Sequence, residues 1–266
     1  MVAEMTIREH LEELRVRVIR VAIAIIIITI FTFSFDLRPI DIGGVTLVYP
    51  YPDPIHSIST SVTFFMQKTL LPATVSLIQI TPGSAFISQI YVSALIGLTA
   101  SMPLIIIEVS AFISPAISPK TKIGLTRVFL PSVALFIGGV VFSYFLVIPF
   151  MLDFLYRYGE SLNVATFITI NDFISFVLQF FLAFGISFQL PIMMYAISLT
   201  NTLSPLFWRQ NFRYAVLILA IFGALITPDG SGITMFLVAG PMILLYLAGM
   251  LIVERRAAAA AIRVDI

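Results

Sequence analysis

Charged residues of both signs crowd the start of the chain, directly before a long apolar run. The stretch reads EHLEELRVRVIRVAIAIIIITI at residues 9–30. On a helix, Glu9, Glu12 and Glu13 would fall within an arc of about 100°. Glu13 and Arg17 are four residues apart, in the order that favours a helical ion pair. Three carboxylates on one face could hold guanidinium groups, each through a two-bond fork.

The arginines of this stretch also have a plain structural interpretation. Arg17 and Arg20 can extend toward lipid headgroups while the neighbouring acids pair with them. The same interpretation is weaker for the acids, because carboxylates on one face repel an anionic leaflet. We therefore expect the acidic face to receive a cation from another molecule.

The composition is that of a helical membrane protein. Of the 266 residues, 59% are hydrophobic and 11% are charged, whereas a soluble domain usually carries about a quarter charged residues. The apolar runs are continuous rather than alternating, which favours helices over a β-barrel. The chain has no cysteine and only two histidines, so we expect no disulfide, metal site, cofactor or cysteine nucleophile. The net charge of +1 gives no indication of nucleic-acid binding.

The apolar runs predict six transmembrane helices. A span needs about 20 apolar residues, and fewer where the bilayer thins. The predicted spans are 16–35, 84–109, 128–152, 172–199, 214–227 and 233–253, of which the fifth is short. Within the long external loop 36–83, the stretch Val62–Ile80 contains Gln67, Lys68 and Pro72, which favours one or two interfacial helices over a seventh span. We predict an all-α integral membrane protein whose residues 1–266 form a single transmembrane domain, a concave, glove-like bundle.

The basic residues predict the orientation. Most of them fall on the N-terminal side of these spans: Arg8, Arg15, Arg17, Arg20, Lys120, Lys122, Arg127, Arg209, Arg213, Arg255, Arg256 and Arg263. The opposite side carries Arg38, Lys68 and Arg157. Under the positive-inside rule this bias predicts a multi-pass protein of the cell membrane with both termini in the cytoplasm.

Several short stretches, in chain order, resemble the TatC family, the multispanning subunit of the twin-arginine protein translocase. They are HLEELRVRV at 10–18, AFISPAIS at 111–118, FSYFLVIP at 142–149, FGISFQLP at 184–191 and LITPDG at 225–230. The resemblance implies a receptor that binds folded cargo proteins through signal peptides with paired arginines. It also implies recruitment of single-span partner subunits of the TatA/TatB type, export driven by the proton-motive force, and a higher-order oligomer in the lipid bilayer.

The resemblance also implies a set of signal-binding residues. Glu13 matches the family's key carboxylate, Arg15 matches the arginine after it, and Glu12 is an additional acid nearby. The first cytoplasmic loop matches through Phe112, Pro115 and Ile117. This chain departs from the family at Thr121, where a second carboxylate is common and where Lys120 and Lys122 would repel an arginine. Glu9, Glu12 or Glu108 could supply that carboxylate instead.

Polar positions within or beside the spans complete the set of candidates. Glu108, at the cytoplasmic end of the second span, could face a wet cavity or extend to the interface. Gln189 replaces an acid common in the family and could bond to another helix or line a cavity. Tyr144 is an intramembrane polar residue that could contact a partner. On the external side the candidates are Asp229, which could cap the sixth span, and Pro50 and Pro52, which stiffen the long loop.

Two other classes of function would require residues that a translocation receptor does not need. A small-solute secondary transporter or proton channel would need ionisable groups at membrane depth, and the middles of the predicted spans contain no Asp, Glu, Lys or Arg. An intramembrane enzyme would need a nucleophile with a base, or a metal cluster. Since the sequence offers neither, we predict a receptor that is not an enzyme.

Overall fold

The computed structural model describes residues 7–42, 44–72, 75–113, 122–161, 167–199, 203–227 and 232–262. These residues are mostly helical, as the sequence predicts. They form two compact units. Unit 1 comprises Met1–Glu108 with Leu152–Leu178, and unit 2 comprises Val109–Met151 with Gln179–Ile266.

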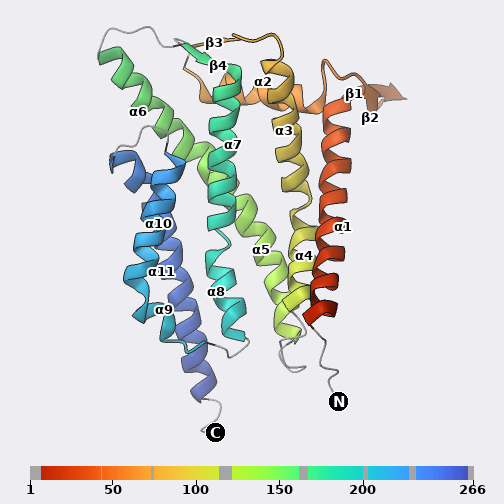
Figure 1. Ribbon diagram of the computed structural model, residues 1–266. Helices are drawn as coiled ribbons and strands as arrows, with labels where there is room; N and C mark the ends of the chain where they lie inside the picture. The colour runs from red at the N-terminus through yellow and green to blue at the C-terminus, as the bar shows by residue number, and fades with distance from the viewer. Residues whose placement is uncertain are drawn as a thin grey trace. The chain divides into compact units, whose positions relative to one another are not determined.

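Three helices form the frame of unit 1. Helix α1, Ile7–Ser34, runs beside α3, Ser84–Ala100 (Figure 1). Helix α4, Met102–Ile113, continues α3 after a bend of 51°. Proline explains the bend, because Pro103 has no N–H to donate to the carbonyl four residues earlier. The bent pair covers the predicted second span.

A glycine sets the spacing of α1 and α3. A methyl group on Gly97 would lie 2.4 Å from the hydroxyl oxygen of Thr29 and 2.8 Å from the carbonyl oxygen of Ile25. Both distances are shorter than real carbon contacts, so only glycine allows the two helices to come this close. Dispersion contacts between the two backbones follow from that approach.

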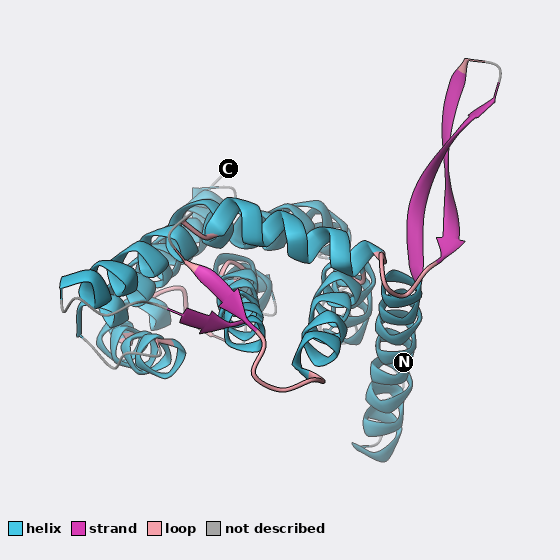
Figure 2. Ribbon diagram, turned by 90° about the horizontal axis from the view of Figure 1, so that it is seen from above, coloured by secondary structure: helices cyan, strands magenta, loops and turns pink. Residues whose placement is uncertain are grey.

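A β-hairpin follows α1 directly, which the all-α prediction did not include. Strand β1, Phe35–Ile42, pairs antiparallel with β2, Val45–Pro52, and the hairpin projects from the end of α1 (Figure 2). Gly44 in the turn has φ +84°, a left-handed value that suits glycine. The sequence signal was present, since paired glycines between alternating apolar and polar residues are typical of a hairpin.

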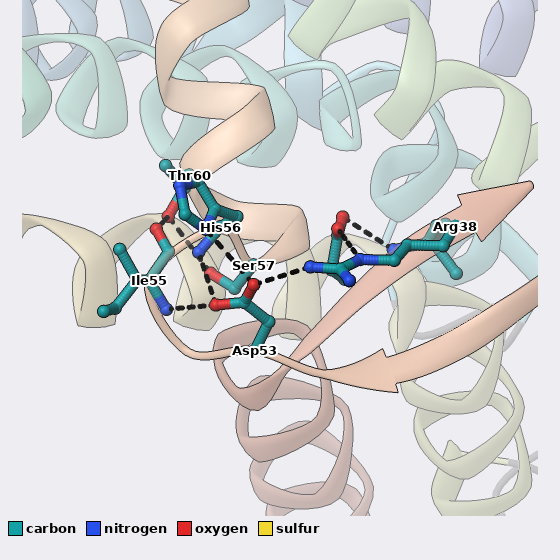
Figure 3. A network of polar contacts seen from close by, with 8 residues as sticks. Arg38, Asp53, Ile55, His56, Ser57 and Thr60 are labelled. Carbon is teal, nitrogen blue, oxygen red and sulfur yellow. Dashed lines mark hydrogen bonds and ion pairs between the residues drawn. The ribbon is translucent and has the colours of Figure 1, made fainter.

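Asp53 ties the end of the hairpin to the next helix (Figure 3). Its carboxylate accepts hydrogen bonds from the amides of Ile55 and His56, both at 3.1 Å, and from Nδ1 of His56 at 3.1 Å. Nη2 of Arg38 on β1 donates to the same carboxylate at 2.9 Å. The backbone hydrogen bond from His56 is the largest of the causes that lower the pKa of Asp53.

Helix α2, Ile58–Leu70, lies across the ends of α1 and α3 (Figures 1 and 2). It packs through Ser59, Thr63, Met66 and Leu70 and leaves Phe64 and Phe65 exposed. Helix α2 therefore covers the first part of Val62–Ile80, where one or two interfacial helices were expected, and a short strand lies in the second part. After it, β3, Ser76–Ile78, pairs in parallel with β4, Phe167–Thr169.

The remaining helices continue the pattern of long apolar segments. Helix α5, Lys122–Phe142, passes through a π-helical turn, Ser143–Val147, into α6, Ile148–Ser161. Pro149 accounts for the π-helical turn, because it leaves the carbonyl of Phe145 without its usual donor. The later helices are α7, Ile170–Ser187; α8, Leu190–Leu199; α9, Phe207–Gln210; α10, Phe212–Ile226; and α11, Gly232–Ile262.

Close helix packing also characterises unit 2. A methyl group on Gly249 of α11 would lie 2.6 Å from the sulfur of Met194 on α8. One on Gly223 of α10 would lie 2.9 Å from the carbonyl oxygen of Met235 on α11. Small residues at such contacts are typical of helices that associate in a membrane, where apolar burial provides little driving force.

The described helices overlap the six predicted spans, but only some of them are long and apolar enough to cross a membrane. Four are long and apolar enough to cross a membrane: Arg8–Ser34, Phe129–Ser161, Ile170–Leu199 and Gly232–Ala258. The bent pair of α3 and α4 would be a fifth, and Phe212–Ile226 is a shorter apolar helix. The first helix begins before residue 16 and the third continues past residue 152, because polar residues extend both helices beyond their apolar parts.

The packing of α1 on α3 predicts the effect of a larger residue at Gly97. Gly97→Val should lower the free energy of unfolding by about 1–3 kcal/mol, because the added methyl groups force the helices apart. Thermal unfolding of the protein in detergent measures the change. Gly138→Val is the matched control, because nothing lies within 4 Å of a methyl group there. Equal melting temperatures for the two variants would contradict the proposed contact.

The junction at Asp53 predicts a dependence on pH. Since its pKa is lowered in the folded protein, its stabilising effect is complete above the ordinary carboxyl pKa and is lost as pH falls through the lowered value. Protection of the Ile55 and His56 amides from hydrogen exchange should therefore fall in acid.

Asp53→Ala should reduce that protection at neutral pH as well. Asp153→Ala, which removes an exposed carboxylate paired with Arg157, serves as the control and should leave these amides unchanged. Undiminished protection in the Asp53 variant would show that the carboxylate does not hold the junction.

Candidate functional site

The acids at the start of α1 border a shallow hollow. It has a volume of about 370 Å³ and is lined by Glu9, Glu12, Glu13, Val16, Arg17 and Arg20. The residues share one face because their spacing of three or four matches the helical repeat. The three acids thus share one face of α1, as the sequence predicts, and Arg17 and Arg20 lie on the same face.

Glu13 is held by an arginine of its own helix through one of its two oxygens. Nε of Arg17 donates to Oε1 of Glu13 at 3.1 Å, and Nη2 of Arg17 donates to the same oxygen. The other oxygen, Oε2, is buried and accepts no hydrogen bond from the described residues. Nδ1 of His10 lies 3.8 Å from this oxygen. Glu13 therefore retains an acceptor for a further donor.

Glu108 on α4 forms the buried end of the same cluster. Only 7% of the surface of Glu108 is exposed. Nη1 of Arg17 donates to Oε2 of Glu108 at 2.7 Å, and Nη1 of Arg20 donates to Oε1 at 3.2 Å. Arg17 thus bridges Glu13 and Glu108, which shows that both carboxylates lie within reach of one guanidinium group.

Carboxylates predominate in this cluster. Glu9, Glu12, Glu13 and Glu108 bring four carboxylates, whereas Arg17 and Arg20 bring two guanidinium groups. Glu9 makes a further interaction of its own. An open site rich in carboxylates favours a cation, and arginine suits it best because its planar fork matches a carboxylate.

Other predicted residues lie outside this cluster. Arg15 is exposed on α1, about 200° around the helix from Glu13, so the structure does not bring it to the acidic face. Phe112 is half-buried on α4, one turn after Glu108. Pro115, Ile117, Thr121 and Asp229 lie outside the described residues. Pro50 and Pro52 lie in β2 of the hairpin.

Two intramembrane polar residues make contacts within unit 2. Nε2 of Gln189, in the turn between α7 and α8, donates to the carbonyl of Ser132 on α5 at 3.0 Å. This is a bond to another helix, one of the two alternatives that the sequence offers for Gln189. Tyr144 lies in the π-helical turn, edge-to-face on its neighbour Phe145 at a centroid distance of 5.0 Å, and its ring lies 6.0 Å from that of Phe181 on α7.

From the sequence we expect Arg17 and Arg20 to extend toward lipid headgroups with neighbouring acids as partners. The structure adds Glu108 on α4 as a partner of both. The spacing of Glu13 and Arg17 gave a sign of the first ion pair. No local signal could reveal that Glu108 pairs with Arg17, because the two residues are 91 positions apart in the chain. Among the residues that the structure describes, no three His, Asp or Glu side chains gather as a metal site would require.

Comparisons with known proteins agree over nearly the whole chain. Residues 9–241 match the family described as Sec-independent protein translocase protein (TatC). The chain is 49% identical over 255 residues to the Sec-independent protein translocase protein TatC of Cenarchaeum symbiosum, with 96% of both chains covered. It is 29% identical over 245 residues to that of Carboxydothermus hydrogenoformans, covering 91% of this chain and 90% of the relative.

A solved structure is similar as well. It is a crystal structure of a protein described as Twin Arginine Translocase Receptor TatC, with a TM-score of 0.75 and 29% sequence identity. The match covers 92% of this chain and 98% of the other. The residues matched by the family contain all the motifs from HLEELRVRV to LITPDG.

Proposed function

The chain belongs to the TatC family, and on this basis we propose that it is a translocase receptor that binds the paired-arginine signal peptides of folded proteins. The family consists of subunits of a Sec-independent protein translocase and is not a family of enzymes. The chain is accordingly a multi-pass membrane protein of protein transport.

One observation carries the assignment of the binding site. Glu13, at the position of the family's key carboxylate, keeps a buried oxygen without a hydrogen-bond donor among the described residues. It borders a hollow whose carboxylates outnumber its guanidinium groups. A ligand arginine would supply the donor that this oxygen lacks, and a second arginine would be attracted by the same group of carboxylates. Glu12, on the same face, would add to the attraction, whereas a role for Arg15 rests on the family motif alone.

The orientation in the membrane is part of this proposal. Six spans in one concave transmembrane domain of the cell membrane would leave both termini in the cytoplasm, in agreement with the bias of Lys and Arg. The site would then face the compartment in which cargo folds. The hairpin, α2 and the stretch around Asp229 would lie on the external side.

The fifth span supports a passage through thinned lipid. Helix α10 has 15 residues, so it rises about 22 Å against a hydrocarbon core of about 30 Å. The difference favours local thinning of the bilayer, which would lower the barrier to a crossing chain. Single-span partners of the TatA/TatB type and a higher-order oligomer would complete the pathway, with the proton-motive force driving export.

Binding of a paired-arginine peptide tests the proposal. Glu13→Gln should weaken the affinity about tenfold or more, because a charge-assisted hydrogen bond is lost from a partly hydrated site. The measurement is fluorescence anisotropy of a labelled peptide with the full chain in lipid nanodiscs. Affinity should also fall as salt rises, since much of the attraction is Coulombic.

Glu160→Gln is the matched control, because Glu160 is an exposed acid on α6, outside the proposed site. It should bind the peptide as the unaltered chain does. The proposed function would be refuted if the unaltered chain failed to prefer the paired-arginine peptide over a copy with both arginines replaced by glutamine.

A further inference from the structure

We propose that Glu108 is the second carboxylate for the paired arginines, and that Arg17 and Arg20 occupy it as an internal substitute until a ligand arrives. This inference rests on the proposed function and assigns a residue to the position that the family motif leaves empty here. The family resemblance implies an acid at position 121, where this chain has Thr121 between two lysines, so a second acid for the ligand would come from elsewhere in the fold.

Glu108 already binds arginines in the way that the ligand would require. It receives guanidinium groups from two residues three positions apart, one on each carboxylate oxygen. Carboxylates accept several hydrogen bonds, about two at each oxygen. The chain's own arginines thus form the interaction that a paired-arginine peptide would form.

The two carboxylates are also close enough to act together. The single guanidinium group of Arg17 reaches Glu13 through Nε and Glu108 through Nη1. A ligand guanidinium group that replaces Arg20 on Glu108 would therefore lie close enough to Glu13 for a second ligand group to reach that carboxylate. The hollow is lined by three carboxylates and two guanidinium groups, which favours a cationic ligand.

The internal arginines differ in how firmly they are held. The side chain of Arg17 is 19% exposed and is bonded to both acids. The side chain of Arg20 is 60% exposed, and its contact with Glu108 is longer, at 3.2 Å. A long, exposed side chain can turn toward water or headgroups at little free-energy cost. Arg20 is therefore the group that a ligand arginine displaces, while Arg17 keeps the two carboxylates in place.

Competition of this kind predicts opposite effects for two substitutions. Arg20→Gln should tighten binding of the paired-arginine peptide about two- to fivefold, because an exposed ion pair no longer has to be broken. Glu108→Gln should weaken binding about tenfold, because the second acceptor is lost. Once Glu108→Gln is present, adding Arg20→Gln should have no further effect, since Arg20 then has no carboxylate to block.

Arg213→Gln separates competition from a general change in charge. Arg213 is an exposed arginine of α10 that takes no part in the cluster around Glu108, so its loss changes the net charge equally without opening Glu108. It should leave the affinity nearly unchanged. If Arg213→Gln tightened binding as much as Arg20→Gln, the effect would be one of overall charge, and the proposal that Arg20 competes with the ligand would be refuted.

The assay is the nanodisc anisotropy measurement with the paired-arginine peptide. Arg20→Gln keeps the inference testable if Glu108→Gln does not fold, since Arg20 is exposed and its loss leaves Arg17 on both acids. Peptide binding that depends on Glu13 but is unchanged by Arg20→Gln overturns the inference and leaves the proposed function standing. Absence of any preference for paired arginines in the unaltered chain overturns both.

Discussion

Hydrocarbon offers no hydrogen-bond partner to a peptide group, and this constraint shapes every long element of the chain. Backbone N–H and C=O groups in a membrane have to be satisfied within their own segment, which selects helices. Two local exceptions among the described helices lie at prolines. Pro103 follows the bend between α3 and α4, and Pro149 follows the π-helical turn. The helix is adjusted at these points rather than interrupted, because each proline removes one donor.

Loss of water also determines which partners the charged groups at the start of α1 need. A carboxylate as buried as Glu108 requires partners that compensate for the water it has lost. Arg17 and Arg20 provide them, and Arg17 shares its guanidinium group with Glu13. Unit 1 is thereby joined at one end by ion pairs and along α1 and α3 by the close approach at Gly97. Such a cluster suits a receptor for cations, because the arginines that neutralise the carboxylates in the fold can be replaced by arginines of a ligand.

The hairpin at the other end of α1 is built so that it does not recruit further strands. Three prolines of the hairpin lie at equivalent positions of the strand register. Pro39 is on β1, and Pro50 and Pro52 of β2 lie opposite Leu37 and Phe35. Proline fits a two-stranded sheet where its missing N–H would face outward. β1 thus lacks one donor, at Pro39, and β2 lacks two, at Pro50 and Pro52, which weakens the pairing of an added strand. The exposed surface then consists of side chains, among them Leu47, Val48 and Tyr49.

The sequence by itself determined the class of protein, the positions of its apolar helices and the acidic face of α1. Each of these depends on local composition or on helical periodicity, which the chain carries without reference to distant residues. The sequence also contained the signals of the hairpin, which are a pair of glycines and flanking residues that alternate between apolar and polar. These signals are weaker than those of the continuous apolar runs. The tertiary structure decided the partners of Arg17 and Arg20 and the role of Gly97. Those outcomes depend on which residues of α3 and α4 lie against α1, and spacing within one helix carries no information about its neighbour.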